Sequence, residues 1–195
     1  FFGYHVVVLL LGCFPISIFA LPNLWGDRQP EEEVIETHPL YVCKRSDFAT
    51  WMQLLFWVVL ILFSLVRTKI VHYSSLCYFP LTYLGALTLW RAIHWDVRPR
   101  WVGVVVAVMG VLVGGVAAAV PYFGQHLDLL KPLFAHDNFA LENLKANVDW
   151  ELWQGWPGIV LALASVGGAW LWFRGRAWDT AQLIFAGGGT FVMFT

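Results

Sequence analysis

The stretch Val102-Gly-Val-Val-Val-Ala-Val-Met-Gly-Val-Leu-Val-Gly-Gly-Val-Ala-Ala-Ala-Val120 decides the class of fold to which this chain belongs. None of its nineteen side chains is charged or donates a hydrogen bond. An α-helix rises 1.5 Å per residue, so a stretch of this length extends about 28 Å, close to the thickness of the hydrocarbon core of a bilayer. We therefore expect a transmembrane helix. Small residues at helical spacing let a neighbouring helix approach closely, and this stretch contains Gly103, Gly110, Gly114 and Gly115.

The composition of the whole chain points the same way. Of its 195 residues, 59% are hydrophobic and 13% are charged, whereas a soluble domain has about 25% charged residues. This composition excludes a soluble globular domain and indicates a protein that crosses a membrane several times. The formal net charge of −1 gives no indication of a nucleic-acid partner.

Further apolar runs lie on both sides of the first stretch. Together they predict six spans: Tyr4–Leu21, Phe48–Val66, Ser74–Trp90, Val102–Val120, Trp156–Phe173 and Ala181–Thr195, the last of them truncated. We expect an all-α polytopic transmembrane helical bundle that forms a single domain over residues 1–195. The chain opens without a Met and stops inside an apolar run, so we expect it to be a piece of a longer protein. Pro15 predicts a kink in the first span.

Two long polar segments separate the spans. In residues 23–47, Glu31-Glu32-Glu33 fits the first turn of a short helix, because carboxylates there match the helix dipole. In residues 121–155, apolar side chains recur at helical spacing from Phe139 to Trp153, which predicts an amphipathic helix at the membrane surface. The side of the bundle with residues 23–47 carries eight Lys or Arg residues and the other side four. The positive-inside rule therefore makes residues 23–47 a cytoplasmic loop and residues 121–155 an outer loop.

The loop between the second and third spans gathers several polar side chains. It reads Ser64-Leu-Val-Arg-Thr-Lys-Ile-Val-His-Tyr-Ser-Ser-Leu-Cys-Tyr-Phe-Pro80. Helical spacing would place Lys69, His72 and Tyr73 on adjacent turns of one face, with Arg67 close by. Such a cluster can hold an anionic headgroup, although cations that simply snorkel to the interface are the plainer interpretation. The charge rule places this loop on the outer side, where cations are disfavoured, and that favours a ligand.

The same residues resemble a signature of one membrane family. The run Phe63-Ser64-Leu65-Val66-Arg67-Thr68-Lys69-Ile70-Val71-His72-Tyr73 follows the pattern Phe-Ser-x-x-x-x-Lys-x-x-x-Tyr and leads to a helix that contains Pro80. Two upstream pieces, Gly12-Cys13-Phe14-Pro15 and Lys44-Arg45-Ser46-Asp47-Phe48, are similar to parts of that family which precede its signature helix. From Tyr4 to Leu87 the chain resembles the 4-amino-4-deoxy-L-arabinose transferase-like group. This group is related to the protein O-mannosyltransferases and belongs to the GT-C glycosyltransferases.

The resemblance implies a transferase that takes a sugar from a polyprenyl-phosphate donor at the outer face of the bacterial plasma membrane. The acceptor would be a lipid, a protein or a glycan. By the same resemblance Lys69 and Tyr73 lie beside the carrier phosphate, with His72 and Arg67 as further candidates. A positioned Lys and a phenolic donor would stabilise the negative charge that develops on the leaving phosphate.

No residue here matches the catalytic acid of that family, which lies in its first outer loop, so the catalytic residues stay unassigned. The outer side offers five carboxylates in no matching motif: Asp128, Asp137, Glu142, Asp149 and Glu151. A divalent metal held by His126, Asp128, His136 and Asp137 is a further alternative, and a solvated polar loop explains these residues equally well. Cys13, Cys43 and Cys77 show neither metal spacing nor an obvious pairing, and we expect no disulfide.

Two other classes of function stay open. A transporter or flippase for a lipid-linked or anionic solute would place charges at mid-membrane in broken helices, and the predicted spans carry almost none. A non-catalytic structural subunit would use Lys69 and Tyr73 only as interface residues. The feature that favours the transferase is the position of this cluster on the outer side.

Overall fold

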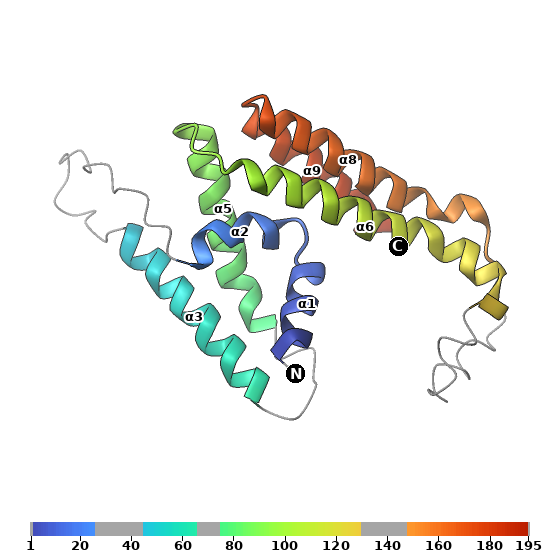
Figure 1. Ribbon diagram of the computed structural model, residues 1–195, viewed down its shortest axis with the longest axis horizontal. Helices are drawn as coiled ribbons and strands as arrows, with labels where there is room; N and C mark the ends of the chain where they lie inside the picture. The colour runs from blue at the N-terminus through green and yellow to red at the C-terminus, as the bar shows by residue number, and fades with distance from the viewer. Residues whose placement is uncertain (1, 26–44, 66–74, 130–147, 195) are drawn as a thin grey trace.

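The computed structural model of the protein describes residues 2–25, 45–65, 75–129 and 148–194 (Figure 1). These residues form seven α-helices and three short 3-10 helices, and no strand occurs within these ranges. The all-α class predicted from the sequence is therefore confirmed. The elements are α1 (Phe2–Gly12), α2 (Ile16–Leu24), α3 (Arg45–Leu65), η1 (Ser75–Cys77), α5 (Tyr78–His94), α6 (Arg100–Gln125), η2 (Leu127–Leu129), η3 (Leu152–Gly155), α8 (Trp156–Phe173) and α9 (Ala177–Phe194).

Three helical segments are long and apolar enough to cross a membrane. They are Phe48–Leu65 in α3, Arg100–Gln125 in α6 and Leu152–Phe173 in η3 and α8. Three of the six predicted spans thus have the length and composition expected of them. The predicted end of the fourth span at Val120 falls too early, because α6 continues to Gln125. Helices α5 and α9 occur where spans were predicted, but neither is among the three.

The first predicted span is broken, not merely kinked. α1 ends at Gly12, α2 begins at Ile16, and α2 runs across the bundle in a different direction from α1 (Figure 1). The prediction of one continuous span from Tyr4 to Leu21 is therefore wrong. Pro15 has no N–H to continue the α-helical hydrogen bonds. The Ser17 side chain instead donates a hydrogen bond across the break, from Oγ to the main-chain oxygen of Leu10 at 2.8 Å.

Helix α2 joins two groups of helices. The first group contains α1, α2, α3 and α5, and in the second α6, α8 and α9 lie side by side (Figure 1). Ala20 and Leu24 of α2 belong to the core of the first group, whereas Ile18 and Phe19 belong to the core that reaches α6, α8 and α9. The ring of Phe19 lies 5.6 Å from that of Trp172 in α8. This nine-residue helix therefore contributes to both cores.

The second group packs through small residues, as the glycine spacing predicts. A Cβ added at Gly110 would lie 2.0 Å from the Ser165 hydroxyl oxygen. At Gly114 it would lie 2.4 Å from the main-chain oxygen of Gly158. Gly115 points elsewhere, since nothing lies within 4 Å of a Cβ added there. The prediction of close helix approach is confirmed for the first two of these glycines and wrong for Gly115.

Some predictions lie wholly or mainly outside the described residues. They concern the turn at Glu31–Glu33, Cys43 and most of the amphipathic helix from Phe139 to Trp153. The described end of that helix region, residues 148–151, is not helical, and η3 follows it. Cys77 is buried and Cys13 is partly buried, and both pack with the first core as small apolar side chains.

Candidate functional site

The four residues predicted to bind a carrier phosphate, Arg67, Lys69, His72 and Tyr73, lie outside the described part of the chain. The elements on both sides of them are described. α3 ends at Leu65 and η1 begins at Ser75, and these two ends lie near the start of α1 (Figure 1). We call this region, where α1 and η1 begin and α3 ends, the α1 end of the first helix group.

Two polar side chains at the α1 end have buried polar atoms, although Ser64 as a whole is only partly buried. His5 of α1 is 5% exposed, and its ring meets the Tyr4 ring edge-on at 5.3 Å between centroids. Ser64 lies in the last turn of α3. Within the described part of the chain, neither His5 Nδ1 nor Ser64 Oγ has a hydrogen-bond partner, and both atoms are buried. Most buried polar atoms in proteins are hydrogen-bonded, so this pair requires an explanation.

A different kind of polar cluster centres on Asn23, near the opposite end of this helix group. Asn23 is 4% exposed, and its Nδ2 donates hydrogen bonds to Leu84 O at 2.8 Å and to Thr88 Oγ1 at 2.7 Å. Its Oδ1 accepts a hydrogen bond from Arg91 Nη1 at 2.7 Å. The side-chain amide of Gln53 donates to the main-chain oxygen of Asn23. The cluster therefore ties α2 to both α3 and α5.

Sequence reasoning missed the Asn23 cluster because it assigned this residue to the polar loop of residues 23–47. The available signal lies in α5, where Leu84, Thr88 and Arg91 recur at helical spacing and so share one face. A polar side chain and a cation on the inner face of an apolar helix need a partner, and Asn23 is that partner. The hydrogen bonds given above satisfy both ends of its amide, so the cluster holds helices together without needing a ligand.

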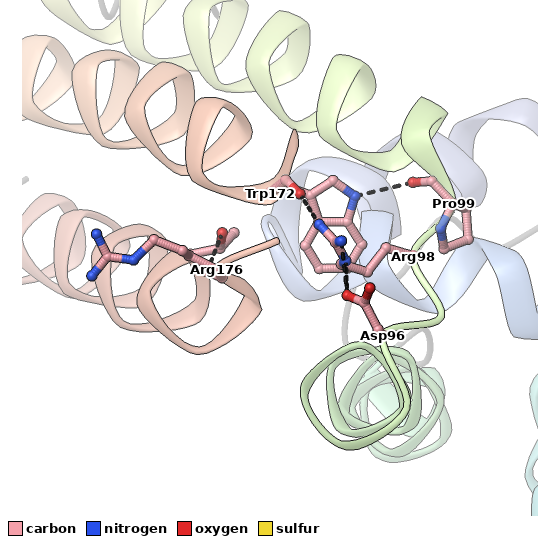
Figure 2. A network of polar contacts seen from close by, with 6 residues as sticks. Asp96, Arg98, Pro99, Trp172 and Arg176 are labelled. Carbon is pink, nitrogen blue, oxygen red and sulfur yellow. Dashed lines mark hydrogen bonds and ion pairs between the residues drawn. The ribbon is translucent and has the colours of Figure 1, made fainter. Parts of the chain in front are cut away.

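Figure 2 shows a third polar cluster, in which Arg98 links the loop before α6 to the end of α8. Arg98 Nη1 donates a hydrogen bond to Trp172 O at 2.5 Å, and Arg98 Nη2 lies 2.7 Å from the Asp96 carboxylate. The Trp172 indole N–H donates in return to Pro99 O at 3.1 Å. The last carbonyls of a helix lack partners within the helix and carry partial negative charge, so a guanidinium is well suited to this position. Arg98 had entered the sequence argument only as one of the loop cations.

The basic side chains collect at one end of the helices. In the described ranges, each Lys or Arg whose side chain is placed lies in or beside the α5–α6 loop or the α8–α9 turn: Arg91, Arg98, Arg100, Arg174 and Arg176. The hydrogen bond from Arg98 to Trp172 joins this loop to this turn. Arg174 lies over the Trp170 ring at 3.8 Å, as expected of a cation beside an interfacial aromatic residue.

The described residues at the other end of α6, near Gln125, form no metal site. His126 stacks on Tyr122 at 4.6 Å between ring centroids, and no group of three metal-binding side chains occurs in the described ranges. His136 and Asp137 lie outside them. Among the carboxylates considered as catalytic acids, Glu151 accepts a hydrogen bond from the Trp153 indole and caps the start of η3. Asp149 is exposed, whereas Asp137 and Glu142 are also outside the described ranges.

Comparison of the chain with protein-family models, with curated proteins and with solved structures finds no match.

Proposed function

We propose that this chain is the membrane part of a glycosyltransferase that takes a sugar from a polyprenyl-phosphate donor. Transfer takes place at the outer face of a bacterial plasma membrane, to a lipid, protein or glycan acceptor. Lys69 and Tyr73 contact the carrier phosphate, and His72 and Arg67 assist them. No residue of this chain is assigned as the catalytic base.

The observation that carries this proposal is the place where α3 ends. The apolar segment Phe48–Leu65 is long enough to cross a membrane, and it stops directly before the run that contains Arg67, Lys69, His72 and Tyr73. A phosphate attached to an isoprenoid tail lies at this depth, with its charge at the boundary and its tail among apolar helices. The exposed apolar side chains of α3, among them Leu54, Val58 and Leu62, suit contact with lipid or with such a tail.

The distribution of charge supports the outer location. The described basic side chains cluster at the α5–α6 loop and the α8–α9 turn, and such residues accumulate on the cytoplasmic side of membrane proteins. α3 runs toward the α1 end and α5 runs back from it to the basic α5–α6 loop, so the basic segment between them is expected at the outer surface. Two cations kept on the disfavoured side are well explained by an anionic ligand.

The chemistry of donor cleavage needs what this segment offers. When the sugar leaves, the bond to the carrier phosphate breaks and negative charge grows on the phosphate oxygens. The Lys69 ammonium and the Tyr73 hydroxyl can donate hydrogen bonds to those oxygens, and such donors lower the energy of the transition state more than that of the bound donor.

A transporter or flippase of a lipid-linked or anionic solute is the second candidate. The break between α1 and α2 favours it, because discontinuous helices form substrate sites in many transporters. In the described residues, however, the break is closed by the Ser17 hydrogen bond to Leu10 and holds no charge. A structural subunit without activity remains the third candidate.

The test compares sugar transfer by the full-length protein in membranes, using a set of labelled polyprenyl-phosphate sugars. We expect Lys69→Ala to reduce turnover by about 100-fold, the lower end of the range seen when a transition-state donor is removed. Tyr73→Phe should reduce it by about 10-fold, the effect of losing one hydrogen bond to a charged group. Arg176→Ala and Tyr122→Phe are matched controls, since both side chains are exposed and lie away from the α1 end. Equal turnover in Lys69→Ala, Tyr73→Phe and the wild type would contradict the proposed site. Absence of turnover in the wild type across all donors would favour the transporter or the structural subunit.

A further inference from the structure

His5 and Ser64 extend the first core by one helical turn toward the α1 end. His5 stands four residues before Leu9 in α1, and Ser64 stands four residues after Leu60 in α3. Leu9 and Leu60 belong to the same buried cluster, which also contains Cys77 of η1. Residues four apart share one face of a helix. α1 begins where α3 ends, so both polar side chains continue this cluster in the same direction (Figure 1).

The burial of a polar atom without a hydrogen-bond partner lowers the stability of a fold. His5 is 95% buried, with Nδ1 unpartnered in the described residues, and Ser64 Oγ is unpartnered there as well. Buried hydroxyls elsewhere in these helices have partners: Ser17 donates to Leu10, Ser165 to Leu161 and Thr180 to Gly168. The fold is therefore able to satisfy a buried hydroxyl, and the α1 end is where it leaves two polar groups open.

We propose that His5 and Ser64 form part of a binding site for the phosphate of a prenyl phosphate, a role that rests on the function proposed above. The Ser64 hydroxyl donates one hydrogen bond to a phosphate oxygen. The His5 ring donates a second from Nδ1, in the tautomer or protonation state that carries a hydrogen there. The exposed apolar side chains next to the pair, Tyr4 of α1, Leu65 of α3 and Leu76 of η1, form the surface along which an isoprenoid chain lies.

An oxyanion suits these groups better than a cation or a sugar. Both atoms can act as hydrogen-bond donors, and bonds to an ionised acceptor are about twice as strong as those between neutral groups. No carboxylate lies in the described parts of α1, η1 or the last four turns of α3, so no like charge opposes an anion there. A single phosphate on an apolar tail meets both the polar pair and the exposed apolar side chains next to it.

The experiment measures binding of decaprenyl phosphate to the full-length protein in detergent, with decaprenol as the phosphate-free control. His5→Phe keeps an aromatic ring of similar size and removes both ring nitrogens, and Ser64→Ala removes only the hydroxyl. We expect each variant to raise the Kd for the phosphate by about 10- to 150-fold, the effect of losing a hydrogen bond to a charged group. Binding of decaprenol should not change. Ser165→Ala is the matched control, because this buried hydroxyl already has its partner in Leu161.

Two further readouts separate binding from folding. Without ligand, the Tm of His5→Phe and Ser64→Ala should equal or exceed that of the wild type, because each change removes an unsatisfied buried group. With ligand, their gain in Tm should be smaller than that of the wild type. His5→Asn, which can place an amide donor near the position of Nδ1, should retain more of the affinity than His5→Phe.

The outcomes distinguish this inference from the proposed function. If Lys69→Ala loses affinity while His5→Phe and Ser64→Ala bind like the wild type, the inference is wrong and the proposed function stands. If the wild type does not bind decaprenyl phosphate, both are wrong. If inorganic phosphate displaces the lipid at comparable concentration, the site takes the free anion, and the lipid assignment is overturned.

Discussion

Arg98 and Trp172 hold each other across the junction between the two helix groups. The guanidinium donates a hydrogen bond to the main-chain oxygen of Trp172 at 2.5 Å, and the indole of Trp172 donates to the oxygen of Pro99, next in sequence to Arg98 (Figure 2). The buried Trp172 ring also touches Phe19 of α2. One pair of residues thus connects the α5–α6 loop, the end of α8 and the central helix α2.

This pairing predicts that Arg98→Ala destabilises the protein. The substitution removes a charged donor and leaves the Trp172 oxygen without it, at an expected loss of about 1.5–3 kcal/mol in the free energy of unfolding. Asp96→Asn should lose less than about 1 kcal/mol, because its side chain is 76% exposed and surface ion pairs contribute little. Denaturation in mixed micelles, followed by Trp fluorescence, compares the two variants. Equal loss in both would show that the ion pair, not the helix-end hydrogen bond, provides the stability.

The Asn23 cluster predicts a second stability effect. Asn23→Leu would remove two hydrogen bonds, the one that Arg91 Nη1 donates to the amide oxygen and the one that the amide donates to Thr88, so we expect a loss of about 2–4 kcal/mol. Thr82→Val is a suitable control, because that exposed hydroxyl donates to Tyr78 O within its own helix. The same micelle denaturation serves as the readout. A loss below 1 kcal/mol for Asn23→Leu would mean that water or a rearranged Arg91 replaces the amide.

The distribution of basic residues predicts the orientation of α6. Asp96 precedes this helix and Asp149 follows it, and both are exposed. In a background without Cys13, Cys43 and Cys77, we expect Asp149→Cys to react with a membrane-impermeant maleimide in intact cells. Asp96→Cys should react only after permeabilisation, because the positive-inside rule places its neighbour Arg98 in the cytoplasm. The opposite labelling pattern would reverse the orientation and remove the outer location from the proposed function.

How far the sequence predicts this fold depends on the element. α6 and α8 are predictable because a long apolar run has one stable solution in a membrane, a helix that satisfies its own backbone. The break between α1 and α2 is not predictable with the same rule, since Pro15 is compatible with both a kinked and a divided helix. Packing decides between them: α2 turns to fill the space between two cores, with Ile18 and Phe19 on one side and Ala20 and Leu24 on the other.

The polar residues also differ in how well the sequence predicts their contacts. The positions of Arg98 and Asn23 on the sequence indicate only a loop, because their partners, Trp172 and Arg91, are 74 and 68 residues away. The role of His5 is equally hard to predict from the sequence. A single histidine in an apolar run is as consistent with a hydrogen-bonded core residue as with a ligand-binding residue. The run from Phe63 to Tyr73 is the opposite case, since its spacing predicts an anion site while Arg67, Lys69, His72 and Tyr73 lie outside the described ranges.

The contrast between Gly114 and Gly115 offers the sharpest test of the α6–α8 interface. A Cβ at Gly114 would lie 2.4 Å from Gly158 O and 2.9 Å from Ala162 N, so Gly114→Ala must push the two backbones apart. We expect a loss of about 1–3 kcal/mol, the usual effect of overpacking. Gly115→Ala adds the same methyl group one residue later, where nothing lies within 4 Å, and should change stability by less than about 0.5 kcal/mol. Denaturation in micelles measures both variants in parallel. If both are equally destabilised, the loss reflects the helix itself and not its contact with α8.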